Sequence, residues 1–277
     1  MRSILAIVGL LCCLMAEAQT IRVMSYNIRY DNPGDGVNAW PNRTDKVVVL
    51  IQKYNPDIIG LQEALHHQLQ DLLRVLPEYT MVGVGRDDGG TKGEFSAILY
   101  KHSRFGVLSR GTFWLSETPD EAGSKSWDAA LPRIATWARL FDKESKAEFF
   151  FLNTHFDHVG KLARTNSAQL IKNKLTELSQ KMSVIISGDF NCTPEEEPYH
   201  EMIAETDPVL FDSNQRNPVG TYCGFEINQV ECRPIDFIFH SKEWIVNMHH
   251  VITDNDGKYY PSDHLPVLAE LFLAHPK

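Results

Sequence analysis

Short apolar runs recur along the whole chain, and most of them have the length and composition of β-strands. They are rich in Val, Ile, Phe and Tyr and are bounded by polar or glycine-containing segments. Several are apolar throughout, as is typical of strands buried on both faces. The pattern predicts strands at residues 21–28, 57–63, 79–84, 95–100, 135–142, 148–155, 184–190, 235–240, 244–252 and 265–273.

Helical spacing of apolar residues appears between some of these runs. It predicts helices at residues 43–54, 63–76 and 162–182, the last with an apolar stripe from Ala168 to Leu178. Strands mixed with amphipathic helices predict an α/β fold of layered sheets covered by helices. Because no linker or shift in composition divides the chain, we predict one domain over residues 19–277.

The first residues have the pattern of a targeting segment. A positive Arg2 precedes the apolar run 4–15, and Ala-Glu-Ala at 16–18 offers a cleavage site. This predicts a secretory signal peptide at residues 1–18 and export to the periplasm or the extracellular space. An N-terminal membrane anchor is the alternative, which the shortness of the apolar run disfavours.

Export would place the remaining cysteines in an oxidising compartment, where disulfides persist. Cys223 and Cys232 flank a segment that can fold back as a hairpin, so we predict that they pair and that Cys192 stays free. Three buried thiols are the alternative, because pairing requires a specific approach of the two Cα atoms. No Cys-x-x-Cys motif is present, so the sequence does not indicate a zinc or redox site.

The net charge of −9 limits the classes of partner. Such a chain lacks the broad basic surface of a high-affinity nucleic-acid binder. It does not exclude a nuclease, because a bound metal can supply local positive charge.

Polar side chains that can bind a metal or move a proton stand at the ends of the predicted strands. One such residue alone is usually a turn former or an ordinary histidine. Strand ends gather at one rim of a layered fold, however, and ligands bind outside such ends in α/β sheets. We therefore expect one site formed by Asn27, Glu63, His155, Asp189, Asn191, Asp236, Asp263 and His264.

The residue types in this set select the chemistry. Carboxylates and amides without cysteine suit a hard cation such as Mg²⁺, with Mn²⁺ as the alternative. Glu63 together with Asp263 or Asp189 would supply enough carboxylate ligands for Mg²⁺. Histidines beside carboxylates supply proton transfer. The set predicts metal-assisted attack of water on a phosphate ester.

Six motifs occur in a fixed order: MSYNIR, LQEAL, NTHFDH, SGDFNCTP, IDFIF and SDHLPV. In these the chain resembles the endonuclease/exonuclease/phosphatase superfamily, which includes deoxyribonuclease I, apurinic repair endonucleases, nocturnin-type deadenylases, secreted sphingomyelinases and inositol polyphosphate 5-phosphatases. The resemblance covers nearly the whole predicted mature chain and implies a four-layer sandwich of two packed, mixed β-sheets flanked by helices. Two segments depart from the broad family, at 28–43 and 113–137, and suggest an exported bacterial branch.

The resemblance also implies roles for residues of the first metal-binding motifs and the terminal motif. Glu63 is expected to be the principal metal ligand, with Asn27 beside the metal and Asp263 bound to it directly or through another group. Asp236 is expected to accept a hydrogen bond from His264, which fixes the tautomer of the ring and raises its basicity.

The base that activates water stays open between Asp189 and His264. Asn191 is expected to donate to a phosphate oxyanion. His155 is expected to lie opposite the leaving group.

Two further charged residues are expected to support the site. The resemblance implies that Glu94 holds His155 and that Arg133 reaches the scissile phosphate, with a solvated charge and a structural ion pair as the respective alternatives. Asp157 and His158 are expected either to line the cleft or to hold its flanking loop.

The leading prediction is an exported, Mg²⁺-dependent phosphodiesterase or nuclease, acting as a monomer without a stable protein partner. The alternatives are a phosphomonoesterase, as for inositol phosphates, and a phospholipid head-group hydrolase. The latter needs an exposed apolar element, for which residues 112–116 are the candidate, although they could equally form a strand. Trp114 and Trp127 are expected either to stack on a base or a sugar or to pack against their own loop. A non-catalytic binding module ranks last, because it predicts a missing ligand and none is missing.

Overall fold

The computed structural model describes residues 20–274, except 215, 217–218 and 229–230. The predicted signal peptide therefore lies outside the described residues. Within them, no helix is long and apolar enough to cross a membrane.

The first of two sheets has the strand order β11–β12–β1–β2–β4–β3. Its strands pair antiparallel, except that β1 and β2 run parallel. Their bounds are β1 Ile21–Asn27, β2 Ile58–Ala64, β3 Tyr79–Val82, β4 Phe95–Lys101, β11 Trp244–Val251 and β12 Val267–Leu273.

The second sheet has the order β5–β6–β7–β8–β10–β9, with β7 and β8 parallel and the other pairs antiparallel. It is also six-stranded, so both sheets are mixed. The bounds are β5 Phe105–Trp114, β6 Ile134–Asp142, β7 Glu148–His155, β8 Ser183–Asp189, β9 Leu210–Asp212 and β10 Asp236–Ser241.

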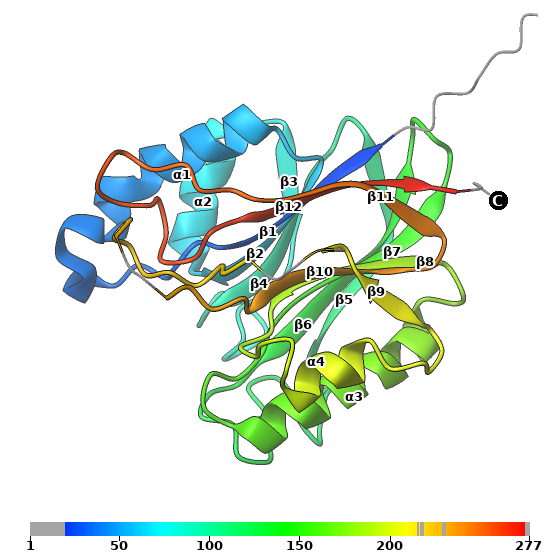
Figure 1. Cartoon of the computed structure of the whole chain (residues 1–277). Coiled ribbons are helices and arrows are strands. Elements are labelled where there is room, and N and C mark those ends of the chain that lie inside the picture. The colour runs from blue at the N-terminus through cyan, green and yellow to red at the C-terminus, as the bar shows by residue number, and fades with distance from the viewer. Residues whose placement is uncertain (1–19, 215, 217–218, 229–230, 275–277) are drawn as a thin grey trace, which may run out of the picture.

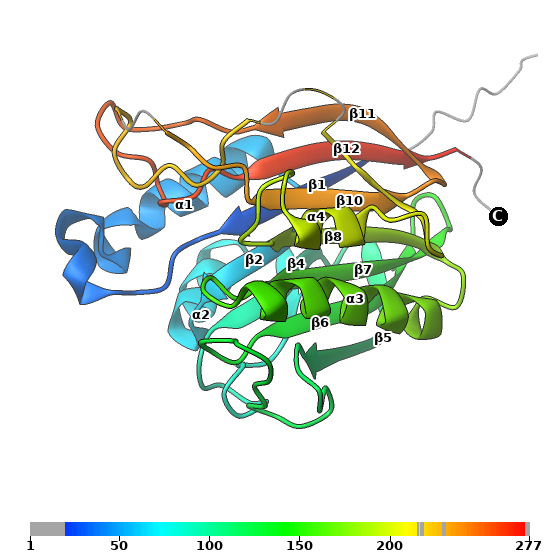
Figure 2. The same ribbon diagram turned by 60° about the horizontal axis from the view of Figure 1, so that its bottom comes forward.

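Helices cover the outer face of each sheet, as Figures 1 and 2 show. On the first sheet lie α1 (Trp40–Tyr54) and α2 (His66–Val75), with the 3-10 helix η1 (Pro33–Asn38) leading into α1. On the second lie α3 (Lys161–Leu178) and α4 (Glu197–Met202). The four layers implied by the family resemblance are therefore confirmed.

Three apolar cores separate the four layers. The central core lies between the sheets and contains Val23 and Ile58 from one side and Phe149 and Ile185 from the other. One outer core joins the first sheet to α1 and α2, and the other joins the second sheet to α3 and α4. The apolar stripe predicted on α3 faces this last core.

Close contact between the sheets depends on Gly60 of β2. A Cβ at this position would collide with Asn153 Oδ1 and Ser187 Oγ of the opposite sheet. Instead, Asn153 Nδ2 donates to the carbonyl of Leu61, and Gln62 Nε2 donates to Asn153 Oδ1 at 2.6 Å. These buried hydrogen bonds fix the two sheets against each other at Leu61 and Gln62, directly before Glu63.

All the predicted strands are present, but β5 and β9 were not predicted. β5 alternates irregularly and exposes Leu108 and Arg110 at its centre, and β9 spans only three residues. The candidate membrane element at 112–116 is wrong: Phe113 and Trp114 end β5, and both are buried with Leu115.

Candidate active site and metal centre

The expected gathering of strand ends is present. β1 ends at Asn27, β7 at His155 and β8 at Asp189, while β10 begins at Asp236. In the second sheet Asp189 lies opposite Asp236 on one side and beside His155 on the other. The polar residues of separate motifs are thus brought together by strand register.

These strand ends open into a pocket of about 440 Å³. Its lining includes every predicted site residue except Asn27 and Asp236, which lie buried beneath it. The lining residues are Arg29, Tyr30, Glu63, Glu94, Leu131, Arg133, His155, His158, Asp189, Asn191, Tyr222, Arg233, Ile235, Asp263 and His264.

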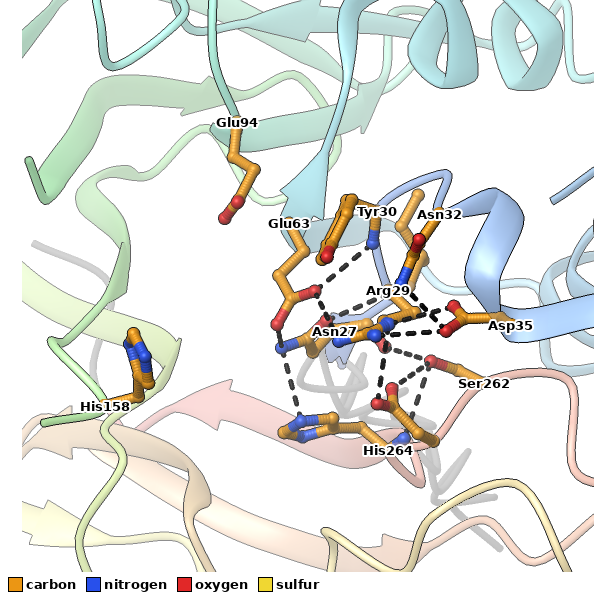
Figure 3. Close-up of polar contacts among 12 residues, drawn as sticks. Asn27, Arg29, Tyr30, Asn32, Asp35, Glu63, Glu94, His158, Ser262 and His264 are labelled. Carbon is orange, nitrogen blue, oxygen red and sulfur yellow. Dashed lines mark hydrogen bonds and ion pairs between the residues drawn. The ribbon is translucent and has the colours of Figure 1, made fainter. Parts of the chain in front are cut away.

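Asn27 forms the centre of the buried network. Its Nδ2 donates to Asp189 Oδ2 at 2.9 Å and to Glu63 Oε1 at 3.1 Å, and Figure 3 shows it between Glu63 and His264. Its Oδ1 accepts from the backbone N–H of Arg29 at 3.0 Å. In this arrangement the Asn27 amide presents its nitrogen to the two carboxylates, and its expected place beside the metal stays a prediction.

An irregular backbone aims Glu63 at the site. The β2–β4 register shifts between Leu61 and Ala64, and Glu63 takes a positive φ of 60°. Residues in this sparsely populated region cluster at functional sites. The carboxylate receives the N–H of Tyr30 at 3.2 Å, so both of its oxygens are held in place.

The expected contact between Asp236 and His264 is present. Asp236 Oδ2 lies 2.8 Å from His264 Nδ1, and His264 Nε2 lies 3.7 Å from Asp189 Oδ2. Burial disfavours the imidazolium, but the carboxylates of Asp236 and Asp189 outweigh it and raise the pKa of His264 well above its usual value. Burial and the neighbouring Asp236 raise the pKa of Asp189 to about 7.

Asn191 positions His155. Its Nδ2 contacts His155 Nε2 at 3.1 Å and donates to the carbonyl of Phe156 at 3.0 Å. An amide nitrogen can only donate, so Nε2 of His155 accepts, and burial and the charge of Arg133 lower the pKa of His155 well below its usual value. Both amide hydrogens of Asn191 are therefore used, and its predicted donation to an oxyanion is not available in this arrangement.

Two groups of side chains have the spacing of a metal site. Glu63, His155 and Asp189 form one, and Asp189, Asp236 and His264 form the other, with ligand atoms within 4.8 Å of one another in each. The first group suits a divalent cation better, because it lines the pocket and combines two carboxylates with an imidazole that is favoured in the neutral form.

Asp263 is in neither of these groups. It lines the pocket beside Arg29 and Ser262, with Arg29 Nε 3.8 Å from its Oδ2 and Ser262 Oγ 3.3 Å from its Oδ1. Burial raises the pKa of Asp263. This placement fits an indirect contact with a metal better than a direct one.

Arg133 is buried against the pocket wall. Its Nη2 donates to His158 Nδ1 at 3.0 Å, and its Nε lies 3.6 Å from Asp157 Oδ2 in an ion pair of the structural kind. Nη1 has no hydrogen-bond partner among the described residues, and a buried guanidinium with an unused donor group in a pocket wall is suited to an anionic ligand.

The predicted role of Glu94 is wrong. Its two oxygens accept from Arg86 Nη1 and Nη2 at 2.7 and 2.8 Å, and no hydrogen bond joins it to His155 in the described part of the chain. The bidentate pair forms because Arg86 and Glu94 lie opposite each other at the base of a loop, where the Arg86 N–H donates to the Glu94 carbonyl.

Three residues with open roles are also placed. Asp157 is buried and accepts backbone N–H groups from residues 130, 131, 159 and 160, so it holds the flanking loop. Trp114 donates from Nε1 to the Arg86 carbonyl and is buried, which removes it as a stacking platform. Trp127 is half-buried and does not line the pocket.

Sequence reasoning missed four charged or aromatic pocket residues, Arg29, Tyr30, Tyr222 and Arg233, as well as the apolar Leu131 and Ile235. Arg29 makes a bidentate pair with Asp35 of η1 at 3.1 Å and stacks on Tyr30. The signal for both was their position: Arg29 ends the first motif and Tyr30 follows it, within a segment that departs from the broad family.

Residues 24–264 match the endonuclease/exonuclease/phosphatase family. The chain belongs to this family. Its members hydrolyse phosphoester bonds, and they depend on divalent metal ions, in keeping with the carboxylate and histidine cluster at the strand ends.

Solved structures and relatives agree with this membership of the endonuclease/exonuclease/phosphatase family. A family protein from Bacteroides thetaiotaomicron is 38% identical, with a TM-score of 0.88 over 93% of this chain and 99% of its own. A mannosyl-6-phosphatase from the same organism is 38% identical, with a TM-score of 0.86 over 91% of this chain and 100% of its own.

Nocturnin from Rattus norvegicus is 26% identical over 90% of this chain. The chain spans between 30% and 65% of the length of the curated relatives that it matches.

Proposed function

We propose that the protein hydrolyses phosphate monoesters of small polyhydroxylated molecules, with sugar phosphates as the best-supported class. The observation that carries this proposal is the form of the pocket. Its floor holds the carboxylates and histidines of the strand ends, and its wall holds Arg133, Glu94 and His158. The likeness to a mannosyl-6-phosphatase across 91% of the chain supports the same class.

The charges around the pocket favour a single phosphate over a polymer. Arg29, Arg133 and Arg233 line it, but Arg29 is already paired with Asp35. A polynucleotide would need a groove of cations that follows successive phosphates. The net charge of −9 and the carboxylates within the pocket argue against such a groove.

The residues present fit a divalent cation. Glu63, Asp189 and His155 would hold it, with His155 Nε2 exchanging its hydrogen bond from Asn191 for the cation; Mg²⁺ is proposed and Mn²⁺ is the alternative. When bound, it would neutralise phosphate charge and lower the pKa of a water molecule.

The side chains divide the remaining tasks. Asp236 accepts from His264 Nδ1, which directs Nε2 into the pocket, and the carboxylates around this ring favour its charged, donating form. We assign His264 to the phosphate oxygen and Asp189 to the proton of the attacking water. Arg133 adds its unused donors to the phosphate from the opposite wall.

A nuclease or phosphodiesterase remains the second candidate function. The similarity to nocturnin favours it, since the two sequences match over 90% of this chain. A diester substrate would need room for a second ester group at the mouth of the pocket, beside the exposed residues around Arg233.

Export is part of the proposal as well. It is supported by the disulfide between Cys223 and Cys232, which confirms the predicted pairing, with Cys192 free and buried. Disulfides of this kind persist in oxidising compartments.

A substrate panel tests the proposal. Purified protein is assayed with hexose 6-phosphates, inositol phosphates, bis-nitrophenyl phosphate, sphingomyelin, plasmid, and single-stranded RNA and DNA, with Mg²⁺ and with chelator. We expect Mg²⁺-dependent phosphate release from the sugar phosphates that Asp189→Ala abolishes. Faster hydrolysis of nucleic acid or of a diester would instead support the second candidate, and wild-type rates in Asp189→Ala would refute the mechanism.

A further inference from the structure

The pocket has a second polar side that the proposed chemistry does not use. Figure 3 shows Glu94 and His158 facing the same open space, away from the network around Asn27 and His264. Glu94 comes from the segment just before β4 of the first sheet, and His158 from the loop after β7 of the second sheet. Each sheet therefore contributes one residue to this wall. Both residues line the pocket together with Arg133.

Glu94 is held rigidly but keeps acceptor capacity. Its carboxylate takes one hydrogen from each of two Arg86 nitrogens, which fills two of its four lone-pair positions. Arg86 itself is 8% exposed, and its carbonyl accepts from Trp114 Nε1, so the pair cannot swing into solvent. The Glu94 side chain remains 16% exposed, on the pocket side.

His158 offers the complementary donor. A guanidinium cannot accept a hydrogen bond, so Arg133 Nη2 must donate to His158 Nδ1. The neutral ring then carries its proton on Nε2. His158 is exposed at the pocket, which leaves this N–H available to a ligand.

We propose that Glu94 and His158 form a subsite that binds hydroxyl groups of the alcohol part of the substrate, and that Glu94 determines specificity for a polyhydroxylated leaving group. This inference rests on the proposed function. A carboxylate held by an arginine can accept from adjacent hydroxyls, and the imidazole N–H can donate to a hydroxyl oxygen. The wall therefore supplies both kinds of partner that a sugar ring requires, while the phosphate is bound on the floor.

The selectivity of this subsite comes from its own polar groups, which need hydroxyl groups of the substrate as partners. A site built to bind hydroxyl groups disfavours an analogue that lacks them, because its own polar groups are left without partners. A six-carbon sugar phosphate and hexyl phosphate form a matched pair of substrates. They share a primary phosphate ester and the same number of carbon atoms, and hexyl phosphate lacks the hydroxyl groups and the ring oxygen of the sugar.

The experiment compares kcat/KM for glucose 6-phosphate or mannose 6-phosphate with that for hexyl phosphate in the presence of Mg²⁺. The variants are Glu94→Gln and His158→Ala, with Glu117→Gln as the matched control, since Glu117 is exposed and does not line the pocket. We expect Glu94→Gln to lower kcat/KM for the sugar phosphate about 10-fold or more beyond its effect on hexyl phosphate, as for the loss of a hydrogen bond to a charged group. His158→Ala should act in the same direction.

The possible results test the subsite and the proposed function independently. Equal losses on both substrates, or no loss on either, would overturn the subsite while leaving phosphate release from wild-type protein intact. If the wild type favours hexyl phosphate over both sugars, the monoesterase stands and the subsite is wrong. If it releases phosphate from none of them, the proposed function itself has failed. Should Glu94→Gln not fold, His158→Ala decides, because His158 is an exposed loop residue.

Discussion

Asn27 Nδ2 and Asp189 Oδ2 lie 2.9 Å apart, and this hydrogen bond joins the two sheets at the floor of the pocket. Asn27 ends β1 in the first sheet and Asp189 ends β8 in the second. The bond also places an uncharged donor between two carboxylates, because the same nitrogen donates to Glu63. Asn27 therefore offsets part of the repulsion within the cluster before any cation is bound.

Replacing Asn27 with aspartate should make folding depend on metal. The change removes the donor and adds a buried carboxylate beside Asp189 and Glu63, which should destabilise the metal-free protein by about 3 kcal/mol or more. Mg²⁺ or Mn²⁺ should restore much of this loss. Thermal unfolding with cation and with chelator measures the effect, and Asn255→Asp on an exposed loop is the control. A Tm of Asn27→Asp that does not respond to cation would contradict the placement of the metal.

Loss of the charged hydrogen bond between Asp236 and His264 should lower the kcat of hydrolysis. Asp236→Asn keeps the shape of the side chain but removes the charge that favours the imidazolium. We expect kcat to fall about 100-fold or more, the range for loss of a positioned acid or base, and the Tm to fall as well, because the buried imidazolium of His264 loses its partner. Steady-state kinetics with a sugar phosphate and with bis-nitrophenyl phosphate checks this. A variant with unchanged kcat would show that His264 acts without Asp236.

Substitutions of Glu63 and Glu94 should affect the affinity for Mg²⁺ to different extents. Glu63 belongs to a group of ligand atoms within 4.8 Å of one another, whereas Glu94 is paired with Arg86. Glu63→Gln should weaken Mg²⁺ binding on the order of 10–100-fold, and Glu94→Gln should weaken it much less. Calorimetric titration of both variants decides the point. Equal effects would mean that the two carboxylates share the cation.

The sequence predicted the strands of this fold and the gathering of its site because both depend on local patterns. The apolar runs with polar ends place Asn27, His155 and Asp189 at one rim, and the structure finds them there. The layers could be counted only through the family resemblance, since apolar periodicity does not say which sheets face each other. β9 escaped prediction because three residues carry no period.

Contacts within the site could not be predicted in the same way. The direction of the Asn27 amide is set by the backbone N–H of Arg29, and the reach of Glu63 by a positive φ of 60°. Asn191 likewise has a φ of 48°, which turns its amide toward His155. Such conformations are selected by the surrounding structure and leave no mark in the residue types.

The disulfide between Cys223 and Cys232 should support catalysis as well as stability. The segment that it closes runs beside the terminal motif: Cys223 and Gly224 donate their N–H groups to the carbonyl of Asp263, and the Leu265 N–H donates to Thr221. The Tyr222 ring lies 4.9 Å from that of His264, centre to centre. The disulfide therefore constrains residues that surround His264, the histidine proposed to act on the phosphate.

Replacing Cys223 and Cys232 together with serine should lower the free energy of unfolding by about 2–4 kcal/mol. It should also lower kcat, because the hold of this segment on Tyr222 and His264 is loosened. Treating the wild type with a reductant should reproduce both effects, whereas Cys192→Ser should retain activity, since Cys192 is free and buried outside the pocket. Chemical denaturation and steady-state kinetics measure the two quantities separately. A double variant with reduced stability but unchanged kcat would assign the disulfide to folding alone.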